Sequence, residues 1–434
     1  SGAASLLTSS HSSLRAWACL PASKRIPIAS CMTTTARMTE IANTGEKHTI
    51  DGVEMEFVYV LDTEAPVEIM IWLPQLKAFC TAEDMTHNMH NLQTLRGAKV
   101  RNGLLWSKAV DTAIERYGDR VEVSFSTHHW PTWGNERIVD YWEAQRDMYR
   151  YLHDQTLHLA NRGLTPDEIA EEMKLPASLA SQFNCRGYYG TLSHNVKAQY
   201  DLYFGWFDGN PAHLNPLPPS ELGAKYVEAI GGADKVLEVA KASYAKGEYR
   251  WVATLLDNLV FAEPENKEAR QLLSDTYSQL GYQAESGPWR NFYLTGAQDL
   301  LKKAVPYTSK LINDGVLSQM DMGTLLDYCA IQLNGEKAGG KEAVININFT
   351  DTKEKVMLML KNGVLNHRLG SQDKKADLTM EIAKMDFVKL FFGRTDLQTL
   401  RKTNKVKTTG DTKAIDMIRS AYEPADPNFK IVLP

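Results

Sequence analysis

The sequence contains few cysteines and no cluster of them. Its 434 residues include five cysteines, an odd number, and none forms a Cys-x-x-Cys pair. This distribution argues against a disulfide framework and against a structural zinc site made from closely spaced thiolates. It says little about the compartment in which the protein works. The five are Cys19, Cys31, Cys80, Cys185 and Cys329.

Long hydrophobic runs and blocks of basic residues are also missing. No apolar run approaches the ~20 residues that a transmembrane helix needs, so we expect no membrane span. The net charge of −5 is mild and carries no basic block, which argues against a nucleic-acid partner. With 43% hydrophobic residues, a chain of this length can bury more than one core, and we expect about three domains.

Acidic residues are absent from the first 39 positions. This segment is rich in Ser, Thr and Ala, carries several Arg and Lys, and precedes the first acidic residue, Glu40. Such a composition is typical of an organellar transit peptide, for example a mitochondrial one. A disordered or unrelated terminus explains the composition equally well.

Polar side chains gather between Cys80 and Asn102. We expect this stretch to be a helix in which Glu83, His87 and His90 share one face with Thr94, because helical residues three or four apart lie above one another. One interpretation is a functional site. The other is an ordinary polar helix face in water.

Two adjacent histidines follow a strand-like run between Ser124 and Gly134. His128 and His129 come directly before a Trp-Pro pair. A strand end is a rigid place from which to present a metal ligand, and histidine is a common zinc ligand.

The flanking sequence predicts strands and one helix. Residues 46–79 contain two strand-like runs, the first turning at Asp51-Gly52, with Glu64 in the loop between the runs. A loop glutamate before proline is usually just solvated. We further expect a helix over 107–117 and a strand over 120–125.

Helical patterns dominate from residue 136 to 303. Thr165 and Glu168 form a capping box at a helix start, and an aromatic-dense stretch over 188–207 is more typical of a core or interface than of a cofactor site. Gly247 and Gly281 lie 34 residues apart, the period of the tetratricopeptide repeat. Such helix pairs must stack on other helices or on a second subunit.

The pattern changes again after Pro306. A helix over 321–333, a strand over 342–349, a hairpin turning at Asn362-Gly363 and two final helices predict an α+β domain with one antiparallel sheet and helices on one face. Three methionines, Met357, Met359 and Met380, could line a tunnel for alkyl chains or simply fill the core.

Four motifs together resemble one family. Glu64 in TEAPVE, Glu83 in AED, the run HNLQTLRGAKVRN and HHWPTWG are similar to those of the alkylsulfatases, zinc hydrolases of the metallo-β-lactamase superfamily that cleave long-chain alkyl sulfate esters. The likeness runs from about Met38 to the C-terminus. The family's His-x-His-x-Asp-His motif does not occur in this sequence, so we expect the C-terminal portion of such a protein, with little activity by itself.

The resemblance implies a role for individual residues. Glu64, Glu83 and His128 match ligands of two zinc ions, which activate water for the attack on the ester, and no other catalytic residue is implied. Asn91 and Arg96 match positions that hold the sulfate group. His90 and His129 have no ligand role in the motif and are expected behind the ligands, where they could orient them.

The resemblance also implies the architecture, a multidomain α/β plus α fold, and a homodimer. The expected parts are an unrelated or transit-like segment (1–39), part of a metallo-β-lactamase αββα sandwich (40–145), a helical dimerisation domain (146–302) and a domain like sterol carrier protein (303–434). Relatives in bacteria would be periplasmic or secreted. An alternative is a non-catalytic, dimeric carrier of lipids or alkyl chains.

Overall fold

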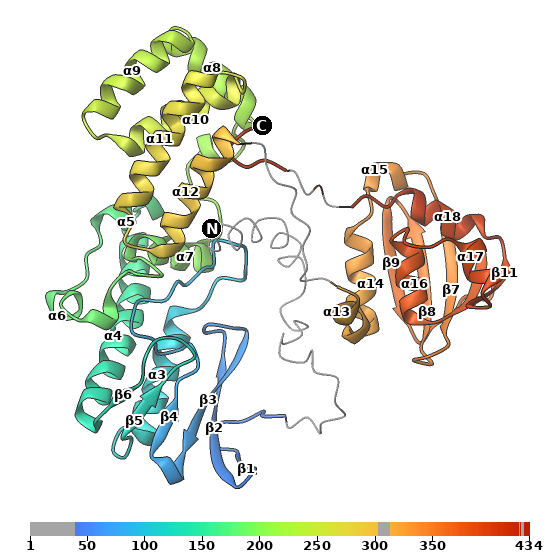
Figure 1. Ribbon diagram of the computed structural model, residues 1–434, viewed down its shortest axis with the longest axis horizontal. Coiled ribbons are helices and arrows are strands. Elements are labelled where there is room, and N and C mark those ends of the chain that lie inside the picture. The colour runs from blue at the N-terminus through green and yellow to red at the C-terminus, as the bar shows by residue number, and fades with distance from the viewer. Residues whose placement is uncertain (1–39, 303–312, 425, 427–428) are drawn as a thin grey trace. The chain divides into compact units, whose positions relative to one another are not determined.

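The computed structural model describes residues 40–302, 313–424, 426 and 429–434, which form two compact units (Figure 1). The first unit contains residues 40–302 together with 430–434, and the second contains the other described residues. The predicted transit-like segment, 1–39, lies outside the described residues. No helix in the described part of the chain is long and apolar enough to cross a membrane.

The first unit begins with a sheet of six strands among its described residues, in the order β1-β2-β3-β4-β5-β6. Neighbouring strands are antiparallel, except β4 and β5, which are parallel. The turn between β1 and β2 contains Asp51 and Gly52, both with positive φ, as the sequence predicted. The strands are β1 (Lys47–Ile50), β2 (Val53–Leu61), β3 (Val67–Leu73), β4 (Ala78–Cys80), β5 (Val123–Phe125) and β6 (Thr132–Trp133).

Two long helices, α3 (Gly103–Tyr117) and α4 (Asn135–Ala160), pack on this sheet. Tyr117 stacks on Trp72 with ring centroids 5.1 Å apart, and Trp142 meets Phe79 edge-on at 5.1 Å. The same core continues into the helices that follow α4, so the predicted domain boundary at residue 145 falls inside α4, within one core. These helices are α5 (Pro166–Glu172), α6 (Ala177–Ala180) and α7 (Leu192–Phe204). The predicted capping box at Thr165 and Glu168 is confirmed.

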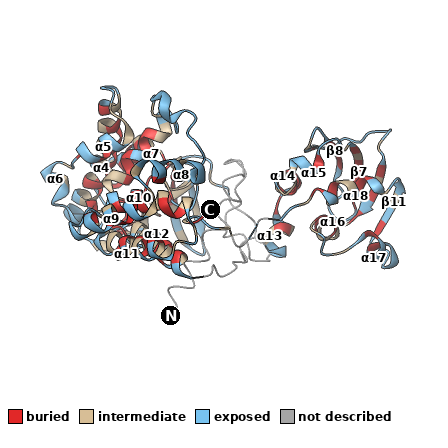
Figure 2. Cartoon of the chain, turned by 90° about the horizontal axis from the view of Figure 1, so that it is seen from above, coloured by how far each residue is buried: buried red, intermediate tan, exposed pale blue. Residues whose placement is uncertain are grey.

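A second core in the first unit is formed mainly by helices. Leu255, Leu256 and Leu273 are buried between paired helices, and Leu433 near the C-terminus joins them. Figure 2 shows buried residues on the inner sides of these helices and exposed residues on their outer sides. The helices are α8 (Pro219–Ile230), α9 (Ala233–Ala245), α10 (Tyr249–Ala262), α11 (Lys267–Gln283) and α12 (Gly287–Leu301).

The second unit has a five-stranded sheet, in the order β11-β10-β7-β8-β9 among its described residues, with helices on one face. Asn362 and Gly363 have positive φ and form the predicted hairpin turn. The strands are β7 (Ala343–Phe349), β8 (Lys355–Lys361), β9 (Val364–Leu369), β10 (Leu378–Ile382) and β11 (Val406–Gly410). The helices are α13 (Asp314–Gln319), α14 (Met322–Ile331), α15 (Gly335–Ala338), α16 (Lys384–Phe391), α17 (Leu397–Lys402) and α18 (Lys413–Ser420).

Two details of the second unit differ from the sequence-based expectations. The sheet is mixed, because β7 and β10 are parallel, and the chain between them contains the hairpin of β8 and β9. The three methionines do not share one interior. Met380 is in the core beside the helices, whereas Met357 and Met359 alternate with the core residues Val356 and Leu358 and therefore lie on the opposite sheet face.

The predicted helix between Cys80 and Asn102 is wrong, because residues 81–102 form an irregular loop. Several of its backbone N–H groups bond to distant partners instead of to the preceding helical turn. Met89 N–H donates to Arg186 O at 2.9 Å, and Leu92 N–H donates to Asn195 Oδ1 at 2.8 Å. Tertiary hydrogen bonds therefore replaced the local ones that helical spacing suggested.

Candidate metal centre

The strand register brings Glu64 and Glu83 to the same edge of the first sheet. Glu64 lies in the loop between β2 and β3, and Glu83 follows β4. Cys80 pairs with Ile71 on β3, so the chain beyond β4 runs back toward the start of β3, where Glu83 N–H donates to Glu68 Oε1 at 3.1 Å. The two carboxylates thus come from loops far apart in the sequence but adjacent in the sheet.

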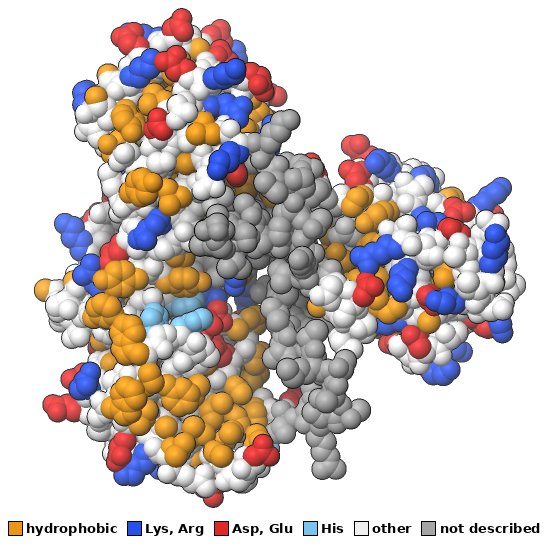
Figure 3. All heavy atoms as spheres, viewed as in Figure 1, with side chains coloured by type: hydrophobic (Ala, Val, Ile, Leu, Met, Phe, Trp, Pro, Cys, Tyr) orange, Lys and Arg blue, Asp and Glu red, His pale blue; other side chains and the backbone are white. Residues whose placement is uncertain are grey.

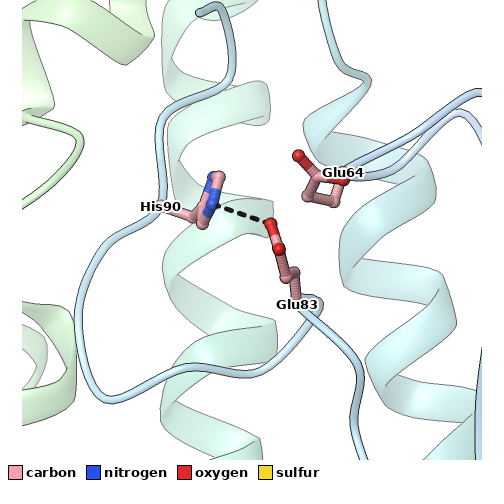
Figure 4. A group of neighbouring side chains, drawn as sticks. All are labelled: Glu64, Glu83 and His90. Carbon is pink, nitrogen blue, oxygen red and sulfur yellow. Dashed lines mark ion pairs between the residues drawn. The ribbon is translucent and has the colours of Figure 1, made fainter. Parts of the chain in front are cut away.

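Three side chains converge at this edge (Figure 4). One ligand atom from each of Glu64, Glu83 and His90 lies within 4.8 Å of the other two, and this is the one such group found among the described residues. His90 Nε2 is 3.6 Å from Glu83 Oε2. Carboxylate oxygen and imidazole nitrogen are ligands that zinc accepts, so the donor set fits a metal ion.

His128 approaches the same carboxylate from the other side. Its Nε2 lies 3.0 Å from Glu83 Oε1, and its side chain is 61% exposed. Each oxygen of Glu83 therefore faces one histidine. The resemblance selected His128 as the ligand and placed His90 behind it, whereas the distances group His90 with the two glutamates. In Figure 3, histidine side chains reach the surface of the first unit between acidic and hydrophobic ones.

The electrostatics of the site separate its carboxylates into two kinds. The contact with His90, together with the contact with His128, lowers the pKa of Glu83 to about 2, which keeps that carboxylate ionised. Burial raises the pKa of Glu68 to about 9, and nearby carboxylates add to this effect. Burial likewise raises the pKa of Asp84 to about 7. Glu83 thus stays ionised, whereas Glu68 and Asp84 resist ionisation.

The two predicted sulfate-binding residues lie on the loop that carries Glu83 and His90. Asn91 is buried, and its Oδ1 accepts a hydrogen bond from Arg101 Nη1 at 2.6 Å. Arg96 is exposed, just before Gly97, which takes a positive φ of 82°. The Arg96 side chain is therefore accessible, and among the residues that the structure describes it forms no hydrogen bond or ion pair with Glu83.

The remaining predicted histidines lie beside the cluster. His129 Nε2 is 3.3 Å from Asn88 Nδ2, and burial lowers its pKa. His87 Nε2 contacts Thr132 Oγ1 at 2.9 Å, and its ring meets Trp130 edge-on at 4.8 Å. His87 therefore does not share a face with Glu83, contrary to the helical expectation.

Sequence reasoning missed Arg101, Glu68 and Asp84. Arg101 forms an ion pair with Glu64 and is buried. Glu68 lies in a predicted strand, and Asp84 directly follows Glu83, so neither position looked unusual. A charged residue in an otherwise hydrophobic strand, as Glu68 is in VEIMIWL, was the one available signal.

Comparison with known proteins gives two family models. The model described as alkyl sulfatase dimerisation matches residues 165–303, and the model described as alkyl sulfatase C-terminal matches residues 310–434. A linear primary-alkylsulfatase from Pseudomonas sp. is 46% identical over 91% of this chain and 59% of its own length. Another, from a different Pseudomonas strain, is 30% identical over 87% of this chain and 73% of its own length. The chain belongs to the alkylsulfatase family.

The structure of this alkylsulfatase-family chain is also similar to a solved one. The inverting sec-alkylsulfatase Pisa1 from Pseudomonas sp. aligns with a TM-score of 0.87 and 43% identity, over 91% of this chain and 62% of Pisa1. The mixed α/β multidomain fold is therefore that of an alkylsulfatase. The chain spans about three fifths of the length of the first curated relatives that it matches.

Proposed function

We propose that this alkylsulfatase-family chain acts in the zinc-dependent hydrolysis of long-chain alkyl sulfate esters, of the dodecyl sulfate type, to alcohol and sulfate. The observation that carries the proposal is the position of Glu83, whose two carboxylate oxygens face His90 at 3.6 Å and His128 at 3.0 Å beside Glu64. Relatives that are named alkylsulfatases support the substrate class.

Glu64, Glu83 and His128 would hold the metal, with two zinc ions in the complete site. When bound, zinc would supply an acidified water molecule and offset the negative charge of the ester. The low pKa of Glu83 keeps its carboxylate in the form that binds a cation. Glu68, directly behind, accepts the backbone N–H of Glu83 and fixes the position from which that carboxylate extends.

Asn91 and Arg96 would bind the sulfate group. The planar guanidinium of Arg96 can donate two parallel hydrogen bonds to neighbouring sulfate oxygens. The Asn91 side chain is held in place by Arg101, which leaves its amide N–H groups as donors. Both residues lie on the loop that carries Glu83, which supports a sulfate site close to the metal.

The finer architecture belongs to the same proposal. The sheet with α3 and α4 would be part of a metallo-β-lactamase αββα sandwich, the helices α8–α12 a tetratricopeptide-like block, and the second unit a domain like sterol carrier protein. Contact between the consecutive helices α10 and α11 supports the helix pair expected from the 34-residue spacing. A homodimer through residues 165–303 is supported by the family model matched there.

Zinc binding tests the metal site directly. In equilibrium dialysis, the chain should retain zinc, and Glu83→Gln should lower the affinity by roughly tenfold or more. Glu54→Gln is the matched control, because Glu54 is an exposed glutamate on β2 and should leave zinc binding unchanged. Equal zinc binding by wild type and Glu83→Gln would exclude this metal site.

Hydrolysis tests the substrate. We would join residues 40–434 to the N-terminal part of the Pseudomonas relative and measure the release of dodecanol from dodecyl sulfate. Glu83→Ala should abolish turnover, and Arg96→Ala should lower kcat/KM by roughly one to two orders of magnitude, because it removes a charged hydrogen bond worth ~1.5–3 kcal/mol. His87→Ala should stay active. A protein that binds zinc but cleaves no alkyl sulfate would contradict the proposed reaction.

A further inference from the structure

Arg101 is a buried charged residue beside the candidate metal centre, held by several hydrogen bonds. Its backbone N–H donates to Leu92 O at 2.8 Å, and its carbonyl accepts from Gln199 Nε2 on α7 at 2.9 Å. Asn102, the next residue, caps the start of α3. The side chain is 8% exposed. A long, flexible side chain is therefore fixed at its base and enclosed along its length.

The Arg101 guanidinium contacts three residues of the site at once. Nη2 forms an ion pair with the Glu64 carboxylate, and Nε donates to Glu64 O at 2.6 Å. Nη1 donates to Asn91 O at 2.8 Å and to Asn91 Oδ1 at 2.6 Å, and it lies 3.1 Å from His90 Nδ1. One cation thus joins the metal-side carboxylate to the residue expected to bind sulfate.

The contact with His90 has a chemical consequence, because a guanidinium has five N–H donors and no acceptor. A ring nitrogen 3.1 Å from a positively charged donor is stabilised when it presents its lone pair and destabilised when it carries a hydrogen. The other neighbour of Nδ1 is Asn91 O, also at 3.1 Å, which has a second lone pair, but a hydrogen on Nδ1 would also face the positive charge of Arg101. In the neutral ring the hydrogen then resides on Nε2, which faces Glu83 Oε2 at 3.6 Å.

We propose that Arg101 is the positioning residue of this centre: it fixes neutral His90 with the lone pair on Nδ1 and the hydrogen on Nε2, so that His90 donates to Glu83 instead of ligating the metal. The reference to a metal rests on the proposed function. Distance alone groups His90 with Glu64 and Glu83 as a ligand, whereas the chemistry of Arg101 makes it a donor that orients Glu83. Arg101 also pairs with Oε1 of Glu64, which leaves the other carboxylate oxygen to bind the metal ion.

The tautomer can be measured without any zinc. The zinc-free chain labelled with 15N-histidine gives separate NMR signals for ring nitrogens that carry a hydrogen and for those with a lone pair, and His90→Gln identifies the His90 signals by their loss. At a pH where the ring is neutral, we expect a hydrogen on Nε2 in wild type and on Nδ1 in Arg101→Met. Arg116→Met is the control, because Arg116 forms its ion pair with Glu56 in the same unit, away from His90.

A zinc titration supplies an independent readout. In the wild-type chain, His90→Gln should change the zinc affinity by less than about threefold, because glutamine still offers an N–H to Glu83. In the Arg101→Met background, where His90 is free to bind the metal, the same substitution should lower the zinc affinity by roughly tenfold or more. A hydrogen on Nδ1 of wild-type His90, or a tenfold loss from His90→Gln alone, would overturn the proposal. If Arg101→Met fails to fold, the wild-type spectrum and the single His90→Gln titration still decide it. If the chain takes up no zinc, the proposed function fails, and the NMR result still tests the role of Arg101.

Discussion

Gly190 shows how a single small residue shapes the candidate site. Its backbone lies against the peptide between His90 and Asn91, and a Cβ added there would be 2.4 Å from His90 O and 2.8 Å from Asn91 N. Both are backbone atoms of a loop tied to α7, so they cannot move away cheaply. The close approach requires glycine at this position.

We therefore expect Gly190→Ala to lower the free energy of unfolding by ~1–3 kcal/mol, the usual cost of overpacking, and to weaken zinc binding by displacing His90. Gly287→Ala is the control, because its nearest neighbour, Tyr188 O, would be 3.7 Å from the new Cβ. Urea unfolding compares the two variants. Equal stability of Gly190→Ala and wild type would show that the loop can shift at no cost.

Glu68 gives a pH-dependent prediction. Its pKa is raised by burial to about 9 in the folded chain, from an ordinary value of 4.5, so the folded state binds this proton more tightly than the unfolded state does. Stability linked to this group is complete below pH 4.5 and is lost progressively as the pH rises toward 9. Glu68→Gln removes that loss, and glutamine can keep the Oε1 contact with Glu83 N–H.

Between pH 5 and pH 8, wild type should therefore lose at least ~1 kcal/mol relative to Glu68→Gln, measured by urea unfolding at each pH. Glu54→Gln is the control, because Glu54 is exposed, and this variant should have the same free energy of unfolding as wild type at every pH. A difference between wild type and Glu68→Gln that stays constant with pH would contradict the raised pKa.

At the scale of elements, the loop from 81 to 102 depends on α7. Asn195 is completely buried, its Oδ1 accepts from Leu92 N–H at 2.8 Å, and its Nδ2 donates to His90 O at 2.9 Å. The loop has few hydrogen bonds within itself, and the contacts with Asn195 tie it to this helix. A helix outside the first sheet thus holds part of the candidate metal centre in place.

Asn195→Ala should leave two buried backbone groups unpaired, at ~1–3 kcal/mol each, and should increase hydrogen exchange at residues 88–95 more than elsewhere. Lys197→Ala, on the exposed side of α7, should leave the exchange of these residues unchanged. Unchanged exchange in Asn195→Ala would mean that other contacts suffice to hold the loop.

At the scale of the whole molecule, large hydrophobic side chains remain exposed on the helical part of the first unit. Trp206 is 73% exposed, and Tyr226 and Trp251 are about half exposed on α8 and α10. A subunit interface would cover such residues, and the dimerisation family model matches this region. Light scattering at micromolar concentration should therefore return a dimer, and Trp251→Asp should shift it toward the monomer. A monomer mass for wild type would contradict the homodimer.

Local sequence signals sufficed for most elements. The turns at Asp51-Gly52 and Asn362-Gly363, the capping box at Thr165 and the helix over 107–117 depend on neighbouring residues only, and all of them are present. The motifs also sufficed to name the family. These features can be read from sequence because turn geometry, caps and hydrophobic periodicity are set within a few residues of each position.

The candidate site needed the tertiary structure. The sequence supplied Glu64, Glu83 and His128 through resemblance, but the spacing of Glu83, His87 and His90 predicted a helix that does not exist. The loop is irregular because its hydrogen-bond partners, such as Asn195, lie about a hundred residues away, and a helical pattern cannot reveal competitors at that distance. The role of Arg101 also depends on the tertiary structure, because only the folded chain brings its guanidinium against Glu64, His90 and Asn91. In that buried position, the guanidinium, which can only donate, decides which ring nitrogen of His90 carries the hydrogen.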